Sequence, residues 1–367
     1  MKGTLDKKDI RRIVVRGTNW VGDAVMGVPA LRQLRQAFPE AHITLVVRPW
    51  AEGLFAGADY INTLMTVDRQ GPMSVLEQVR RWRKQEFDLA VLFQNAFEAA
   101  LIPFMARIPL RIGYATDGRR LFLTHPIKLP ERRDEQHEVF YYLNIVKELE
   151  SVFSQTTSVT ARPECAIAVS EARQREAVEK LIAFGAREDH ITVALCPGSI
   201  NSRAKRWPAD RFAELADRLI EEQDVDVLLV GSKDERDVAT EVKRHMRRKP
   251  LDLTGETTLA EAVAILSVID LLVTNDTGPA HIASALGRPT LVIFGPTNPL
   301  TTRPYANTAE IIRKPPDCAP CMLRDCPIDH RCMTAIGVDD VLKKAELLLG
   351  RNNSPTEQLP EATKLLV

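Results

Sequence analysis

The stretch Thr274-Asn275-Asp276-Thr277-Gly278-Pro279-Ala280-His281 decides the fold of this chain. An apolar run over 271–273 stops there at polar residues and a helical pattern begins, which predicts a strand-to-helix turn. Gly278 can adopt backbone angles closed to other residues, and Pro279 suits the first position of a helix. Because the N–H groups of a helix start attract anions, above all phosphates, the stretch predicts a ligand site. The alternative is a polar residue that merely caps the helix.

The same alternation of apolar runs and helical patterns occurs along the whole chain. Strands are predicted over 12–16, 43–47, 64–67, 89–93, 191–195, 225–230, 271–274 and 290–294, and helices over 25–38, 74–85, 98–107, 135–149, 171–184, 209–220, 234–246, 259–266, 280–286 and 338–349. Repeated strand–helix units imply parallel sheets covered by helices. The Ser- and Thr-rich segment 150–162 lacks this periodicity and predicts a linker.

We therefore expect an α/β fold with two Rossmann-like parallel-sheet domains. The first spans 1–165, linker included, and the second spans 166–350, after which 351–367 is expected to be a mobile tail. Open parallel sheets bind ligands at the carboxyl ends of their strands. Two such domains in tandem place these ends on either side of one cleft, where function is expected.

Composition excludes several classes of protein. Of the 367 residues, 45% are hydrophobic and 27% charged, with a net charge of zero, which argues against a disordered chain and gives no general argument for nucleic-acid binding. Residues 1–165 hold 23 Lys and Arg against 19 Asp and Glu, a net charge of +4, so the first domain favours an anionic partner. The polar first ten residues and the lack of a long apolar run predict a cytoplasmic protein without a membrane span.

Polar residues follow three strands of the second domain. Ser199 ends one strand loop and Lys205 lies in the same connection, Glu235 follows the next strand, and the stretch 274–281 follows a third. A diphosphate fits the cation and the helix start, and a ribose hydroxyl pair fits the carboxylate. The Gly-Lys-Ser/Thr order of a P-loop is missing, so the loops predict nucleotide binding of another kind.

The first domain places Asp23 after its first strand and Gln94-Asn95 after a later one. A carboxylate opposite a diphosphate leaving group would serve as a general base that removes a proton from an acceptor hydroxyl. The alternative is an ordinary helix cap at Asp23. Gln94 and Asn95 are candidates to hold acceptor hydroxyls, or they form a plain polar turn.

Four motifs resemble those of the bacterial ADP-heptose:lipopolysaccharide heptosyltransferases (glycosyltransferase family 9). They are Trp20-Val21-Gly22-Asp23, Ala204-Lys205-Arg206-Trp207-Pro208, Thr254-Gly255-Glu256-Thr257 and Asn275-Asp276-Thr277-Gly278. The Trp-Val-Gly-Asp form, with Gln94-Asn95 and the run 100–104, looks most like the members that add the second heptose. The resemblance covers about residues 12–313, with the motifs in family order.

The resemblance implies a GT-B fold, with an acceptor-binding first domain and a second domain that binds ADP-heptose. The implied reaction inverts the anomeric centre, needs no catalytic metal and adds the second heptose to heptosyl-Kdo-lipid A at the cytoplasmic face of the inner membrane. Asp23 matches the catalytic base and Lys205 the cation that steadies the diphosphate. The other donor-binding candidates are Ser199, Glu235 for the ribose, Asp276 for the sugar, and Thr277, Gly278 and His281 near the phosphates. The acceptor-binding candidates are Trp20, Gln94, Asn95, Arg119 and Arg120.

Alternatives to this interpretation remain open. Another heptosyltransferase of the family, adding the first or third heptose, would share these motifs. A nucleotide-sugar epimerase would need no acceptor, and a non-catalytic nucleotide-sugar-binding protein would use Asp23 only as a cap.

Six cysteines are present, and four of them, Cys318, Cys321, Cys326 and Cys332, cluster near the end of the second domain. Such spacing has metal-ligand character, so a structural zinc clip is one prediction, and reduced thiols are the other. Cys165 and Cys196 are expected to be isolated core residues.

Overall fold

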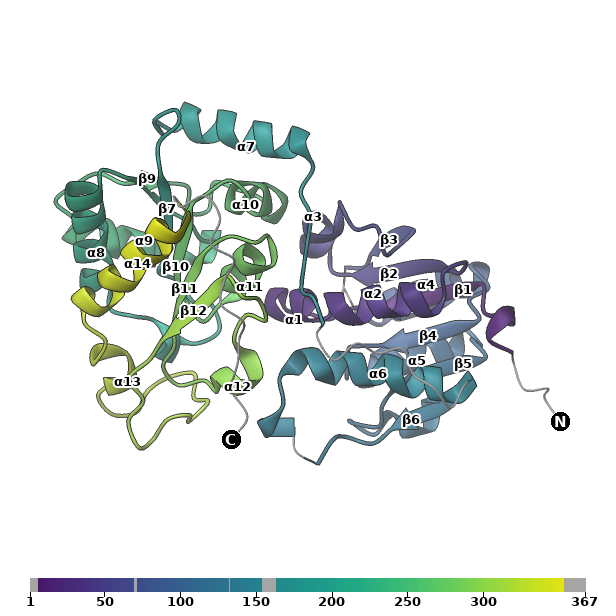
Figure 1. Cartoon of the computed structure of the whole chain (residues 1–367). Helices are drawn as coiled ribbons and strands as arrows, with labels where there is room; N and C mark the ends of the chain where they lie inside the picture. The colour runs from purple at the N-terminus through teal and green to yellow at the C-terminus, as the bar shows by residue number, and fades with distance from the viewer. Residues whose placement is uncertain (1–5, 69–70, 132, 154–162, 353–367) are drawn as a thin grey trace.

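The computed structural model describes residues 6–68, 71–131, 133–153 and 163–352, which form two α/β domains side by side (Figure 1). The first sheet contains β1 (Arg12–Arg16), β2 (His42–Val47), β3 (Thr63–Thr66), β4 (Leu89–Leu92), β5 (Leu110–Tyr114) and β6 (His125–Ile127). The second contains β7 (Thr192–Cys196), β8 (Asp226–Leu229), β9 (Leu251–Asp252), β10 (Leu271–Asn275), β11 (Thr290–Ile293) and β12 (Ala309–Ile312). The predicted pair of parallel-sheet domains is thereby confirmed.

Helices cover both sheets. Those of the first domain are α1 (Val21–Met26), α2 (Val28–Ala37), α3 (Glu52–Phe55), α4 (Gly71–Lys84), α5 (Phe97–Met105) and α6 (Glu138–Phe153). Those of the second are α7 (Glu171–Ala183), α8 (Ala209–Gln223), α9 (Arg236–His245), α10 (Leu259–Leu266), α11 (Gly278–Ala285), α12 (Pro299–Thr302), α13 (Arg331–Thr334) and α14 (Val338–Asn352). Short 3₁₀ turns are η1 (Lys7–Asp9), η2 (Pro49–Ala51), η3 (Arg119–Phe122), η4 (Arg133–Glu135), η5 (Arg203–Lys205) and η6 (Lys233–Glu235).

The two sheets share one topology. Their strand orders are β3-β2-β1-β4-β5-β6 and β12-β11-β10-β7-β8-β9, and their strand pairs are parallel. If the strands of each domain are numbered one to six along the chain, both sheets have the order 3-2-1-4-5-6, the second when it is read from its β9 edge. This is the doubly wound arrangement of dinucleotide-binding sheets. Strand order reverses between β1 and β4 and between β7 and β10. Each domain therefore opens a ligand crevice at the carboxyl ends of those two strands.

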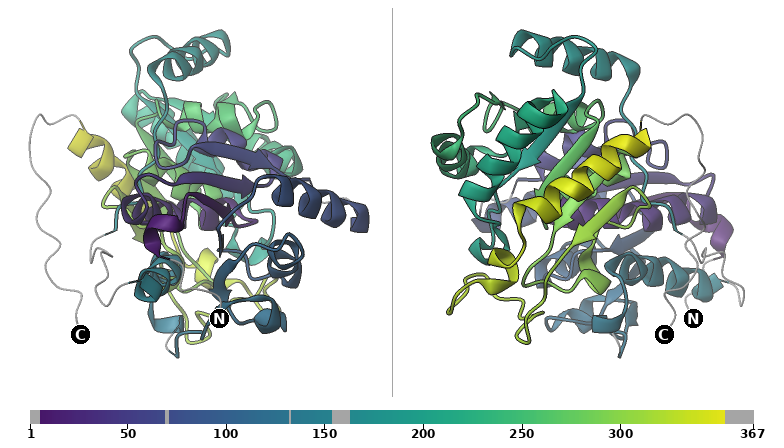
Figure 2. Two further views of the ribbon diagram at one scale, coloured as in Figure 1. Left: turned by 90° about the vertical axis from the view of Figure 1, so that its right-hand side faces the viewer. Right: turned by 60° about the vertical axis from the view of Figure 1, so that its left-hand side comes forward.

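The central strands are apolar because both of their faces are covered. Ile13, Val14 and Val15 in β1 and Leu271, Leu272 and Val273 in β10 are all fully buried, and α14 lies across the second sheet (Figure 2). All predicted strands are present, but β5, β6, β9 and β12 were not predicted. β6 and β9 are edge strands of three and two residues, too short for a periodicity signal.

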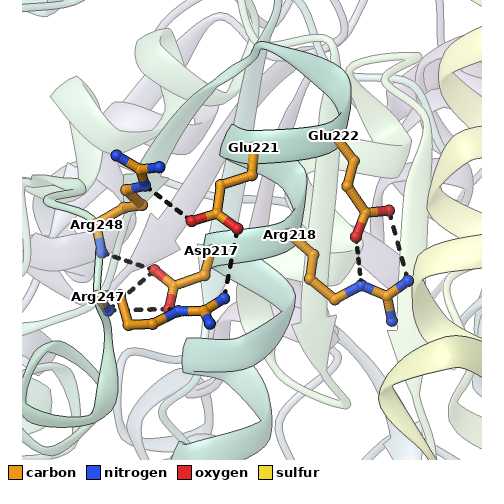
Figure 3. Close-up of polar contacts among 6 residues, drawn as sticks. All are labelled: Asp217, Arg218, Glu221, Glu222, Arg247 and Arg248. Carbon is orange, nitrogen blue, oxygen red and sulfur yellow. Dashed lines mark hydrogen bonds and ion pairs between the residues drawn. The ribbon is translucent and has the colours of Figure 1, made fainter.

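A network of carboxylates and arginines fastens α8 to the turn after α9 (Figure 3). Asp217, which is 2% exposed, accepts the backbone N–H groups of Arg247 and Arg248 and the Nε–H of Arg247. Glu221 pairs with the Arg248 guanidinium at 2.8 Å. A buried carboxylate needs such donors to offset its loss of hydration, so Asp217 is a structural residue of the second domain.

Glycines let the two domains approach closely. α1 of the first domain packs against α11 of the second (Figure 1), and a Cβ atom at Gly278 would lie 2.9 Å from Val21 Cβ. A second contact joins α3 to α10, where a Cβ at Gly53 would overlap Ala260. The first of these contacts sets α1 directly against the start of α11.

The domain limits stay predictions. α6 continues to Phe153, so the start of the predicted linker 150–162 is helical, and residues 154–162 lie outside the described part of the chain. α14 continues to Asn352, and the rest of the predicted tail, 353–367, also lies outside it.

Candidate active site

One cavity of about 490 Å³ lies where the crevices of the two domains meet. Asp23 and Trp20 line it from the first domain, and Lys205, Glu235 and Asp276 line it from the second. Its size is in the range typical of small-molecule sites. The remaining predicted donor residues, Ser199, Thr277, Gly278 and His281, also line the cavity, so the described structure brings the entire predicted donor set together.

Asn275, at the end of β10, ties the loops of the second domain to one another. Its side-chain N–H₂ donates to Pro197 O at 2.8 Å and to Gly198 O at 3.2 Å, and its side-chain oxygen accepts the backbone N–H of Trp207 at 3.0 Å. These bonds fix the ends of β7 and β10 and the residues after Lys205. Asn275 belongs to one of the four sequence motifs, but its role in joining these loops was not predicted.

Asp276 and Lys205 form a half-buried ion pair at the cavity wall. Lys205 Nζ lies 2.8 Å from Asp276 Oδ2 and also donates to Asp276 O at 3.2 Å. The Thr297 hydroxyl donates to the same Oδ2 at 2.7 Å. Both residues line the cavity, and the lysine side chain, 26% exposed, is more accessible than the carboxylate, which is 4% exposed.

The start of α11 is not closed by a side-chain cap. Thr277 occupies the N-cap position, but its hydroxyl donates to Asn275 O at 3.3 Å and makes no cap hydrogen bond. The Asp276 carboxylate is held by Lys205 and Thr297. The simple capping alternative is therefore wrong for both residues, and the helix start opens on the cavity.

Glu235 lies on η6 after β8 and is 8% exposed. One carboxylate oxygen accepts the backbone N–H of Ser232 at 2.8 Å. A Cβ atom at Gly198 would overlap the Glu235 carboxylate, so the glycine in the Pro-Gly-Ser turn after β7 leaves the space that this carboxylate occupies.

Asp23 lies within α1, three residues past the N-cap position, which Trp20 occupies. Burial raises the pKa of the Asp23 carboxyl to about 6, and the nearby Glu138 adds to this rise. A hydrogen bond from the Tyr142 hydroxyl and the charges of Arg133 and Lys205 oppose it. The carboxylate is thus not the helix cap of the alternative interpretation, and it is mostly ionised at neutral pH.

Three neighbours of Asp23 were not predicted from the sequence: Tyr142 and Glu138 of α6, and Arg133 of η4. Tyr142 is buried and its pKa is raised well above its ordinary value, so it stays protonated and donates. Glu138 pairs with Arg133 at 3.2 Å, and the Arg133 guanidinium lies 4.5 Å from the Tyr141 ring centroid. No sequence signal links α6 to α1, because the contact joins segments about 120 residues apart.

His281 of α11 is 5% exposed, and its ring would lie 3.1 Å from a Cβ placed on Gly22. Burial lowers the pKa of this imidazole to about 4, although Asp276 opposes the change. His281 is therefore neutral at physiological pH and packs between the domains.

Of the predicted acceptor-binding residues, only Trp20 lines the cavity. Trp20 is 56% exposed and lines the cavity. Gln94 accepts from Arg16 at 3.0 Å, and the Asn95 side chain donates to the Tyr141 hydroxyl at 2.6 Å and accepts from Arg119 at 2.9 Å. None of these last residues lines the cavity.

Arg119 is fully buried and also donates to the carbonyls of Tyr114 and Gln94. The structure therefore does not support direct contact between Arg119 and an acceptor, because its guanidinium already donates hydrogen bonds to Tyr114, Gln94 and Asn95. Arg120 is exposed at the surface, away from the cavity lining.

The late cysteines are free thiols. Cys318 is exposed, Cys332 is buried at α13, and within the described residues no group of three or more His, Cys, Asp or Glu side chains could hold a metal ion. The predicted zinc clip therefore has no support among the described residues, and the reduced-thiol alternative stays a prediction. Cys165 and Cys196 are buried and unpaired, as expected.

This arrangement can hold an anionic leaving group on one side and activate a hydroxyl on the other. Two Rossmann-like domains meet at a cavity with a carboxylate on the first and a cation and helix start on the second. These features define a GT-B glycosyltransferase.

Comparisons with known proteins specify the family. A sequence profile of Glycosyltransferase family 9 (heptosyltransferase) matches residues 75–331. The chain is 31% identical to Lipooligosaccharide heptosyltransferase 2 of Haemophilus ducreyi over 82% of this chain and 88% of the relative. The E. coli ADP-heptose LPS heptosyltransferase II structure is 26% identical, with a TM-score of 0.78 over 94% of this chain and all of that one. The family 9 glycosyltransferase structure from Veillonella parvula, 24% identical, has the same fold, with a TM-score of 0.81 over 95% of this chain and 99% of that one.

The chain therefore belongs to glycosyltransferase family 9, the heptosyltransferases. The resemblance read from the four motifs and the predicted GT-B fold are both confirmed. Among the described residues, none of the helices has the length and apolar character needed to cross a bilayer.

Proposed function

We propose that this protein transfers L-glycero-D-manno-heptose from ADP-heptose to the heptosyl-Kdo-lipid A inner core of lipopolysaccharide, adding the second heptose with inversion. The observation that carries the proposal is one shared cavity lined by Asp23 on one side and by Lys205, Glu235 and the start of α11 on the other. The acceptor assignment is supported by similarity to heptosyltransferases 2 and II.

The second domain stabilises the leaving group. As the bond between the anomeric carbon and the diphosphate oxygen breaks, negative charge grows on the diphosphate. Lys205 and the N–H groups at the start of α11 lie where this charge would build up, and such preorganised groups lower the barrier. Asp276, paired with Lys205 in the cavity wall, is the candidate to contact the sugar hydroxyls, and Ser199 and His281 also line this side of the cavity.

The first domain activates the acceptor. A hydroxyl of the acceptor heptose attacks the anomeric carbon from the face opposite the diphosphate, and its proton passes to the Asp23 carboxylate. The new carbon–oxygen bond forms as the bond to ADP breaks, so the anomeric configuration inverts. The contact between α1 and α11 covers part of the site and would limit the entry of water, which otherwise competes as the acceptor.

The reaction needs no catalytic metal in this proposal, because Lys205 and the helix start supply the positive charge that a divalent cation would otherwise provide. Trp20, at the mouth of the cavity, is available for stacking on an acceptor sugar. Arg119 holds the Gln94 backbone carbonyl and the Asn95 side-chain amide, and Arg16 holds the Gln94 side-chain amide, at the carboxyl end of β4. We place the enzyme at the cytoplasmic face of the inner membrane, where a lipid-linked acceptor of this kind would be presented.

The hydrogen bond from Tyr142 should set the pH dependence of the reaction. Asp23 acts as a base only when ionised, so kcat/KM should rise with pH and level off above about 6, the pKa of its carboxyl. Tyr142→Phe removes a donor that stabilises the carboxylate, so the rising limb should move to higher pH. The measurement is kcat/KM for the acceptor between pH 5 and pH 9.

Tyr114→Phe is the matched control, since it also removes a buried hydroxyl in the first domain, one that donates to Tyr141 O at 2.8 Å. The rising limb of its kcat/KM pH profile should lie at the same pH as in wild type. If the rising limb of the Tyr142→Phe profile did not move, Tyr142 would not stabilise the Asp23 carboxylate and this prediction would be wrong.

Binding of the donor's ribose by Glu235 should depend on the space that Gly198 leaves for the Glu235 carboxylate. Gly198→Ala would push the Glu235 carboxylate out of its position, and we expect ADP affinity to fall by about tenfold, the loss of one charged hydrogen bond. Calorimetric titration with ADP measures this. Gly350→Ala, where an added Cβ meets nothing within 4 Å, should bind ADP normally, and unchanged affinity in Gly198→Ala would remove Glu235 from the ribose site.

The function is tested by weighing the product. The protein is incubated with ADP-heptose and lipopolysaccharide truncated after the first heptose, and we expect the mass of one heptose to be added. Transfer only to an acceptor lacking heptose, or only to a longer core, would assign the first or third heptose instead. Consumption of ADP-heptose without any acceptor would indicate an epimerase or a hydrolase, and binding without turnover a non-catalytic protein.

A further inference from the structure

The outer face of α5 is apolar although it lies at the surface. Phe97, Leu101 and Phe104 recur at helical spacing along it, and the two phenylalanines are 47% and 44% exposed. The opposite face, which includes Ala99 and Ile102, is buried against the first domain. Surface helices normally turn a polar face to solvent, and here Glu98 is the one charged residue of the helix, so the face of Phe97, Leu101 and Phe104 is apolar and unpartnered among the described residues.

The neighbouring turn η3 enlarges this face. The Phe122 ring lies 5.1 Å from those of both Phe97 and Phe104, and Leu121 beside it is 85% exposed. We call the side chains of Phe97, Leu101, Phe104, Leu121 and Phe122 the α5–η3 patch. Exposed apolar groups that adjoin in this way mark interaction sites.

Basic groups surround the patch. The Arg111 guanidinium lies 5.5 Å from the Phe104 ring centroid and donates to the backbone carbonyls of Phe122 and Ile108, so it supports the patch and is not offered to lipid phosphates. Arg83 at the end of α4 is exposed, although it donates to Met105 O at 2.7 Å. Arg107, at the end of α5, and Arg120, in η3, are exposed. The carboxylates nearest in sequence are Glu98, which is half-buried, and Asp117.

The position of the patch relates it to the cavity. α5 begins just after β4 and η3 follows β5, so both start from the edge of the first sheet that carries the ligand crevice. Phe97 follows Asn95 by two residues. A surface held against this patch would thus lie beside the acceptor side of the cavity.

We propose that the α5–η3 patch docks the enzyme on an anionic lipid bilayer, with its apolar side chains entering the headgroup region and the exposed arginines around it contacting lipid phosphates. Apolar groups ringed by cations match the two layers of such a surface, whereas a second copy of the same basic patch would be repelled. The inference rests on the proposed function, because docking here presents a lipid-anchored acceptor to the cavity.

Vesicle flotation of the full chain tests the surface independently of catalysis. Wild type should float with vesicles of phosphatidylethanolamine and phosphatidylglycerol, and much less with phosphatidylcholine alone. Phe104→Ser/Leu121→Ser should reduce binding by at least about tenfold, and Arg107→Glu by about fivefold. The matched controls lie in the second domain: Ile182→Ser/Leu347→Ser, at residues 42% and 54% exposed, and Lys343→Glu should bind as wild type.

A kinetic comparison separates docking from chemistry. The Phe104→Ser/Leu121→Ser variant should lose transfer to acceptor embedded in vesicles but keep normal ADP affinity and normal transfer to deacylated, soluble acceptor. Equal flotation of this variant and wild type would overturn the proposal, as would a wild-type dimer, seen by light scattering, that the variant loses. If wild type transferred heptose to neither acceptor, the proposed function would fail while the flotation result still decided the surface.

Discussion

Asp23→Ala should lower turnover by roughly 10²- to 10⁴-fold, the usual effect of losing a general base, while ADP-heptose affinity stays nearly unchanged. The carboxylate lies on α1, across the cavity from Lys205, and it contributes nothing to the loops that surround the proposed nucleotide site. The acceptor hydroxyl would then have to lose its proton to water. Turnover at saturating substrates and calorimetric titration with the donor measure the two effects separately.

Glu138 is the discriminating control, because it is a second carboxylate close to Asp23. Glu138→Gln should keep most of the turnover, and its rising pH limb should move to lower pH, since the charge of Glu138 raises the pKa of Asp23. Asp23→Asn, which preserves side-chain volume, should be as inactive as the alanine variant. Normal turnover in Asp23→Asn, or the large loss in Glu138→Gln instead, would reassign the base.

The fold could be predicted from local signals where strands are buried on both faces. β1, β4, β7 and β10 are continuous apolar runs, each followed by polar residues and a helical pattern, and these four strands create both ligand crevices. β5 contains Arg111 and Gly113, which break the apolar run, so it escaped prediction. The missed strands lie away from the two crevices, and their omission did not affect the predicted site.

The donor side was predictable for a related reason. Its residues follow successive strands of one sheet, and topology alone brings those loops together. The neighbours of Asp23 depend instead on how α6 packs against α1, a contact between distant segments that leaves no mark on local sequence. Likewise, the sequence could not show that Arg119 is buried and unable to bind an acceptor, because its burial follows from tertiary packing.

Lys205→Ala should weaken ADP binding by roughly 10- to 150-fold, because a charged hydrogen bond is worth roughly 1.5–3 kcal/mol. The substitution has a second consequence in this structure. Asp276 is only 3% exposed and would lose its cation, leaving Thr297 as a hydrogen-bond donor to the carboxylate. An uncompensated negative charge would then lie beside the proposed phosphate site and repel the ligand.

The pair Lys205→Ala and Lys205→Ala/Asp276→Asn separates these two contributions. Titration with ADP should show part of the affinity restored in the double variant, since the repulsion is gone while the attraction stays lost. Adenosine, which has no phosphates, should bind both variants and wild type alike. If adenosine affinity fell as far as ADP affinity, Lys205 would act only by holding the loop of Asp276, and the positive charge facing the diphosphate would have to come from the start of α11 alone.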